Sequence, residues 1–247
     1  MKKLFKPLPR FDPTADRSQV PSPRTTAVAI LGSALCLLVA EVFVGDLDAA
    51  DDVVAIAEGS GRLTAGGLTH LVAAALLGLA VAGLGPVVRG SVVGRVGWAL
   101  LWGAVPCAGA FAMFHLILVE TGAAGLDRSA MQEFVVARFQ GAGVWALPVG
   151  YFVFLGLSAR LLVTIGLVRR GVASAWAPAL FAVGLVLEVL LADNGTVEIA
   201  SHGLMAVGSA VAAYGLWRVG GGGGAAQPPA PEPAGQAALS GQTALSS

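Results

Sequence analysis

Charged residues are scarce in this sequence. Only 12% of its 247 residues are Asp, Glu, Lys or Arg, whereas soluble globular domains carry about 25%. Hydrophobic residues make up 56% of the chain, and the charges gather in the first 24 residues and between long apolar runs. This distribution is typical of an integral membrane protein. The formal net charge is +0, and no basic stripe interleaves with aromatic residues, so nucleic-acid binding has no support.

Cysteine and enzyme motifs are also in short supply. Cys36 and Cys107 both fall near the middle of apolar runs, where we interpret them as small apolar side chains and not as a disulfide. The sequence lacks a phosphate-binding Gly-rich loop with a following Lys, a Gly-x-Ser-x-Gly elbow and a Cys-x-x-Cys pair. These absences argue against the common enzyme classes, and no cofactor is predicted.

Long apolar runs are what the chain has instead. About 20 apolar residues cross a bilayer as a helix, and backbone groups in lipid need the internal hydrogen bonds that a helix supplies. The alternating pattern of barrel strands is absent. The sequence therefore predicts an all-α fold, a polytopic transmembrane helical bundle of six spans. The expected spans are residues 25–44, 68–88, 96–119, 144–168, 175–192 and 199–217.

The basic residues predict how this bundle is threaded. With six spans, most Lys and Arg fall on one side of the membrane, which is usually the cytoplasmic side. Both termini are then cytoplasmic. We expect a basic, Pro-rich tail over 1–24, the transmembrane domain over 25–219, and a disordered Gly/Pro/Ala-rich tail over 220–247. The basic residues on this side are Lys2, Lys3, Lys6, Arg10, Arg17, Arg24, Arg89, Arg95, Arg169, Arg170 and Arg218.

Ionisable residues recur near the outer ends of the spans. The three histidines of the chain each lie about one turn inside such an end, and several carboxylates lie at a similar level. Ionisable groups inside a membrane usually face the bundle interior and pair with one another. The histidines are His70, His115 and His202, and the carboxylates are Glu41, Glu120, Glu188 and Asp193.

Glu188 and His202 form the clearest expected pair. Glu188 lies seven residues before Gly195, where the turn between the last two spans is centred, and His202 lies seven residues after it. In an antiparallel hairpin the two residues reach the same depth, about 10 Å into the membrane from the helical rise. Whether they face each other depends on the rotation of each helix. Small residues along the last span favour close packing, which favours an inward-pointing His202.

Three interpretations of this polar set stay open. The side chains can be interhelical hydrogen-bonding groups that hold the bundle together. They can form a site for a proton, an ion or a small solute that is open to the outside, as in a carrier or sensor. They can also bind a metal such as zinc, with His70, His115, His202 and Glu188 as candidate ligands. No His-x-x-x-His or Glu-x-x-His spacing occurs on any one span.

Arg160 is the one basic residue well inside a span. It lies about eight residues from the inner end of the fourth run. Its long side chain can reach the membrane surface or pair with an acidic group, and we expect it to reach the surface.

The layout of the spans, with fragments such as "MFHLILVETGAAGLD", resembles small six-span membrane proteins of uncharacterised function from high-GC, actinobacterial-type bacteria. The resemblance implies a multi-pass protein of the bacterial inner membrane, with the lipid bilayer as its partner. It assigns no activity and no functional residues. Transport or sensing through the His/Glu set, and a structural or accessory role, are the two functions expected, and a membrane-embedded metal-dependent hydrolase comes third.

Overall fold

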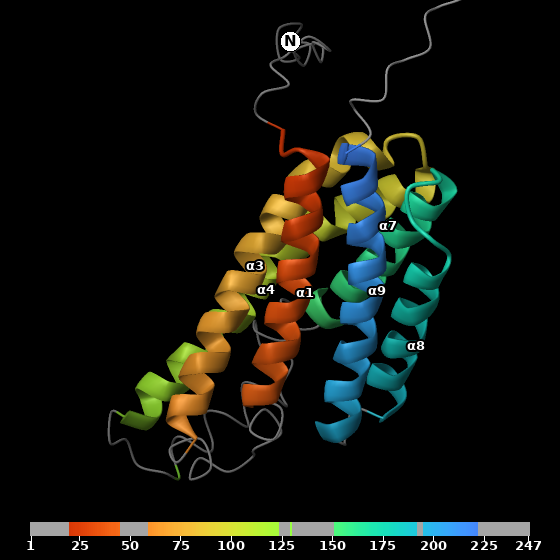
Figure 1. Ribbon diagram of the computed structural model, residues 1–247. Helices are drawn as coiled ribbons and strands as arrows, with labels where there is room; N and C mark the ends of the chain where they lie inside the picture. Colours follow the sequence, from red (N-terminus) through yellow and green to blue (C-terminus); the bar gives the residue numbers. More distant parts are fainter. Residues whose placement is uncertain (1–19, 45–58, 124–128, 130–150, 192–194, 222–247) are drawn as a thin grey trace, which may run out of the picture.

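The computed structural model describes residues 20–44, 59–123, 129, 151–191 and 195–221, which are helical almost throughout (Figure 1). The described part of the chain contains no strand, so the all-α prediction is confirmed there. A π-helical turn, η2, continues directly into α7. The elements are α1 (Pro23–Val44), α3 (Ser60–Val88), α4 (Val92–Ala123), η2 (Tyr151–Gly156), α7 (Leu157–Arg169), α8 (Trp176–Leu191) and α9 (Gly195–Gly221).

Each expected span overlaps one of these helices, with η2 and α7 counted together in the fourth span. Four of them begin earlier than expected: α1 by two residues, α3 by eight, and α4 and α9 by four each. The first residues of the fourth expected span, 144–150, lie outside the described residues, as do most of both expected tails.

Four helices of the described chain are long and apolar enough to cross a membrane. They are α1, α3, Val92–Ile117 of α4 and Thr196–Gly221 of α9, and Trp176–Leu190 of α8 is a shorter apolar helix. The outward surfaces agree with contact to lipid, because large aliphatic side chains are exposed along them. On α1 these are Val28, Leu35, Val39 and Val42, and on α8 they are Val183, Val186, Val189 and Leu190.

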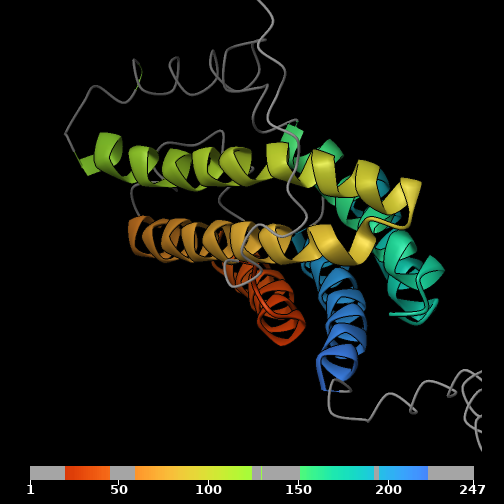
Figure 2. The same ribbon diagram turned by 90° about the horizontal axis from the view of Figure 1, so that it is seen from above.

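The helices contact one another round a closed ring, counting η2 and α7 as one continuous helix. α1 packs against α3 and α9, α9 against α8, α8 against α7, α7 against α4, and α4 against α3. α3 and α4 run at a slant to α1 and α9 (Figures 1 and 2). An apolar core inside the ring draws on α1, α3, α4, α7, α8 and α9, with Val81, Leu101, Val163, Ala177 and Leu216 among its members.

Two glycines allow helices to approach closely beside the polar set. A Cβ at Gly66 of α3 would overlap the side chain of Val44 on α1. A Cβ at Gly184 of α8 would lie 2.8 Å from the carbonyl oxygen of Ser201 on α9. Small residues at such contacts bring helix backbones together, which is how helices associate where no hydrophobic effect drives them. The two close contacts, α1 with α3 and α8 with α9, therefore join helices that carry residues of the expected site.

The arginines near the termini gather at one end of the ring. The guanidinium of Arg24 lies 5.4 Å from the centre of the Trp217 ring, so the start of α1 lies beside the end of α9 (Figure 1). Arg218 lies 5.9 Å from the centre of the Tyr214 ring. A Cβ at Gly90 would strike the guanidinium of Arg170, so the α3–α4 turn lies against the end of α7. The last turns of α1 and the first turns of α3 lie at the opposite end.

Candidate functional site

Glu41, His70 and His202 meet in the interior toward the end of the ring that is remote from these arginines. Glu41 Oε1 lies 3.7 Å from His70 Nε2 and 3.7 Å from His202 Nε2. The carboxylate comes from α1 and the imidazoles from α3 and α9, so three helices supply the contact. Glu41 is only 6% exposed and His70 only 1%. The polar residues therefore meet as expected, and the buried carboxylate of Glu41 lies between the two imidazoles.

The backbone of each helix orients its own histidine. His70 Nδ1 lies 3.1 Å from the carbonyl oxygen of Gly66, one turn earlier. His115 Nδ1 lies 3.0 Å from the Phe111 carbonyl and His202 Nδ1 lies 3.1 Å from the Glu198 carbonyl. A carbonyl oxygen only accepts hydrogen bonds, so each Nδ1 carries a hydrogen. The Nε2 atom of each ring is then the nitrogen that gains or loses a proton.

His70 Nε2 is a buried polar atom without a hydrogen bond in the described residues. Its 3.7 Å separation from Glu41 exceeds the ordinary hydrogen-bond length of about 2.7–3.2 Å. An unsatisfied buried polar atom costs about 1–3 kcal/mol. A small approach of α1 to α3 with a proton on Nε2 would turn this contact into a charged hydrogen bond.

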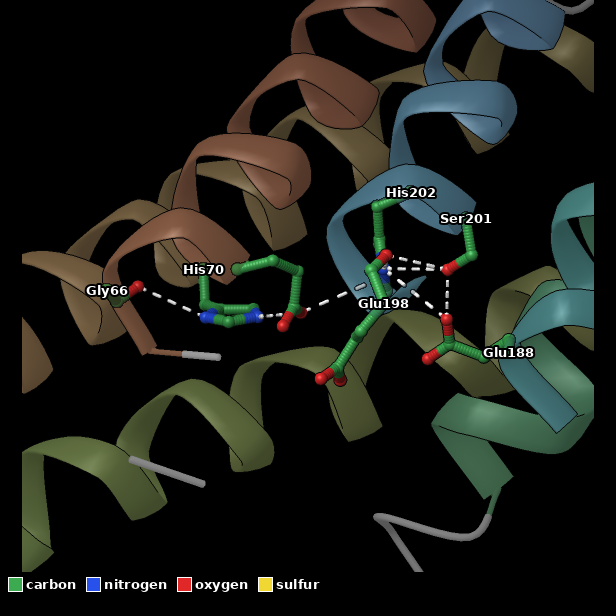
Figure 3. A network of polar contacts seen from close by, with 7 residues as sticks. Gly66, His70, Glu188, Glu198, Ser201 and His202 are labelled. Carbon is green, nitrogen blue, oxygen red and sulfur yellow. Dashed lines mark hydrogen bonds and ion pairs between the residues drawn. The ribbon is translucent and has the colours of Figure 1, made fainter. Parts of the chain in front are cut away.

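The expected pair of Glu188 and His202 is in contact. His202 Nδ1 lies 3.5 Å from Glu188 Oε2, and both side chains are nearly buried. Ser201 donates a hydrogen bond to the same carboxylate oxygen (Figure 3). The sequence predicted that the two residues reach the same depth, and the structure adds the helix rotation that brings them into contact. The serine was not predicted, although its place next to His202 was visible in the sequence.

His115 extends the polar set to α4. Its ring stacks on that of His70, with centres 5.4 Å apart and planes 5° from parallel. The Phe111 ring makes a T-shaped contact with each imidazole, with ring centres 5.1 Å from His70 and 4.7 Å from His115. His115 is fully buried. We call the set of Glu41, His70, His115, Glu188, Ser201 and His202 the His/Glu cluster. It draws on five helices.

Two expected members lie elsewhere. Glu120 is exposed near the end of α4. Asp193 lies outside the described residues. Among the residues that the structure describes, no group of three or more His, Cys, Asp or Glu side chains is arranged to hold a metal ion. The arrangement suits proton exchange between a carboxylate and two imidazoles, because each Nε2 can pass a proton toward Glu41.

A cavity lies inside the ring, nearer its middle. It offers about 40 Å³ to the centres of water molecules, and its lining includes side chains from α1, α3, α4, α7, α8 and α9. Most of the lining is aliphatic, such as Leu77 and Val163. Arg160 of α7 also lines the cavity, with the hydroxyls of Ser33, Thr164 and Ser209. The structure thus places Arg160 on an interior wall, whereas the sequence led us to expect a side chain that reaches the membrane surface.

No protein-family model, no curated protein and no solved structure matches the chain at a significant level.

Proposed function

We propose that this chain is a six-span protein of the bacterial inner membrane that binds protons at the His/Glu cluster and carries them inward. The arrangement of the arginines supports the orientation. Arg24, Arg170 and Arg218 lie at one end of the ring, and membrane proteins keep such residues on the cytoplasmic side. The cluster then belongs to the outer half of the membrane, and both termini are cytoplasmic.

One observation carries the proposal. A buried carboxylate, Glu41, lies between the Nε2 atoms of two imidazoles from two other helices, at 3.7 Å from each. Buried ionisable groups in membrane helices are costly and mark ion pathways and proton relays. A set held only for stability would be expected to satisfy all of its polar atoms, yet His70 Nε2 has no hydrogen bond in the described residues.

Protonation would change the forces between α1, α3 and α9. When an imidazole gains a proton at Nε2, the resulting cation attracts the Glu41 carboxylate and draws the helices together. When it loses the proton, the carboxylate faces a nitrogen lone pair and the attraction disappears. The groups that face Glu41 are His70 of α3 and His202 of α9, with His115 of α4 and Glu188 of α8 behind them. The bundle therefore closes at this end as protons bind.

A structural or accessory role is the alternative. The same contacts join five helices, and Ser201, Glu188 and His202 tie α8 to α9. In that case the cluster would contribute stability but would not exchange protons across the membrane. Glu120 offers a matched control, because it is an exposed glutamate on α4 at the same end of the bundle.

Infrared spectroscopy of the full chain in liposomes tests proton binding. Acidifying the outer solution should produce the carbonyl band of a protonated carboxyl group or the ring bands of imidazolium. Glu41→Gln should remove most of this change, and Glu120→Gln should leave it intact. An identical response from wild type and Glu41→Gln would refute a proton site at Glu41.

Proton flux tests the carrier. A pH-sensitive dye trapped in the same liposomes, in chloride buffer, should report inward proton movement with the wild type and Glu120→Gln. Glu41→Gln should reduce that movement at least tenfold. A wild type that binds protons but moves none would contradict carriage.

A further inference from the structure

The cavity at the middle of the ring is lined by one positively charged side chain, for which the described residues supply no negative partner. Among the described residues that line it, Arg160 is the only charged side chain. No described carboxylate forms an ion pair or hydrogen bond with it. A guanidinium keeps its charge at any ordinary pH, so the protein cannot relieve the burial cost by deprotonation. A charge at this depth calls for a partner of opposite sign.

The hydroxyls around the cavity do not supply that partner. Ser33 donates its hydrogen to the Ala73 carbonyl, Thr164 to the Leu161 carbonyl and Ser209 to the Met205 carbonyl, at 3.0, 2.8 and 2.9 Å. Their oxygens remain neutral acceptors. Arg160 is therefore the residue of this lining whose side chain carries charged N–H donors for an occupant.

We infer that the cavity around Arg160 binds a small monovalent anion, of the size of chloride, formate or acetate. One guanidinium balances one negative charge, so a divalent anion would leave a net charge among aliphatic walls. The space of about 40 Å³ for water centres suits an occupant of one to a few heavy atoms. Carboxylates also match the planar fork of the guanidinium.

This inference rests on the proposed proton carrier and names what moves with the proton. Ser33 precedes Glu41 by eight residues on α1, and Ser209 follows His202 by seven on α9. The cavity therefore lies about 10–12 Å from the cluster along both helices, from the helical rise. A proton at the cluster and an anion at Arg160 add to zero charge, so the loaded bundle avoids moving a net charge through lipid.

Chloride binding to the purified full chain in lipid nanodiscs tests the site without transport. The wild type should broaden the chloride NMR signal, and formate or acetate should reverse the broadening while sulfate should not. Arg160→Gln should weaken chloride binding at least tenfold, whereas Arg160→Lys should weaken it less because the charge is kept. Glu120→Gln should retain chloride binding, because the exposed Glu120 lies outside both the cavity and the His/Glu cluster.

A second variant guards against misfolding of Arg160→Gln. Ala80 lines the cavity and is 1% exposed, so Ala80→Val fills space while leaving the charge in place. It should also weaken binding of acetate more than binding of chloride. No broadening by the wild type, or equal broadening by the wild type, Arg160→Gln and Ala80→Val, would overturn the anion site. Sulfate competing as well as acetate would overturn the monovalent class. None of these outcomes bears on the infrared and proton-flux tests of Glu41. The anion site and the proton site can therefore be refuted independently.

Discussion

The two ends of the helical ring handle ionisable groups in opposite ways. At the end near the termini, Arg24 and Arg218 are exposed and lie over the rings of Trp217 and Tyr214. At the other end, Glu41 and His70 are buried between helices. A cation at the surface keeps its water, and an aromatic ring adds about 0.5–1 kcal/mol. A carboxylate between helices has lost its water and depends on its protein neighbours.

This difference suggests separate roles for the two ends: the exposed arginines anchor helices at the membrane surface, and the buried groups are placed to exchange protons. Exposed arginines over aromatic rings need no partner inside the bundle, so they are suited to holding helix ends at a membrane surface. Buried ionisable groups in direct contact change the packing of helices whenever a proton binds. Function is therefore expected at the cluster end, and substitutions at the two ends should differ in size and in pH dependence.

Replacing Glu41 should have the largest effect on stability. Glu41→Gln removes the charge that faces two imidazoles and should lower the free energy of unfolding by about 3 kcal/mol in acid, where the imidazoles are cationic. The loss should shrink as the pH rises, because neutral imidazoles do not attract the carboxylate. Unfolding by SDS in mixed micelles at acid and alkaline pH measures this, with Glu120→Gln as the control. A loss that is independent of pH would contradict the ion-pair interpretation of the cluster.

A pair of serines compares hydrogen bonds at the two ends. Ser201→Ala removes the donor to the Glu188 carboxylate and should cost about 2 kcal/mol, as expected for a bond to a charged group. Ser22 accepts a hydrogen bond of 3.1 Å from the backbone N–H of Thr25 in an exposed position, and Ser22→Ala should cost about 1 kcal/mol or less. The same unfolding measurement ranks the two variants. Equal costs would mean that burial adds nothing to the Ser201 contact.

The smallest effect is expected at Arg24. Arg24→Gln removes the cation from the Trp217 ring and should lower stability by about 0.5–1 kcal/mol, with no change between acid and alkaline pH. The change can be followed by tryptophan fluorescence, because the emission of Trp217 should shift when its ring loses the neighbouring positive charge. Trp217→Leu serves as the control, since Arg24→Gln should add no further shift in that background. A pH-dependent loss in Arg24→Gln would break the contrast between the ends.

The sequence predicted depth along the helices well. Counting from the turn at Gly195 placed Glu188 and His202 at one level, and the structure has them 3.5 Å apart. The helical rise makes such counting dependable over a few turns. The same counting also predicted that the three histidines lie in one region of the bundle, as the structure shows. Glu120 fits the same counting and is nevertheless exposed, so depth alone does not select the members of the cluster.

Composition and run length by themselves determined that the described part of the chain is helical and has helices suited to a membrane, because lipid leaves few ways to satisfy the hydrogen bonds of a backbone. The rotation of each helix about its axis was decided only in the tertiary structure. The central place of Glu41, the stacking of His70 on His115 and the inward position of Arg160 all depend on that rotation. A helix that is apolar on every side carries no strong periodic signal for the face it turns inward. Close packing at residues such as Gly66 and Gly184 then selects one orientation, and with it the chemistry that the interior can perform.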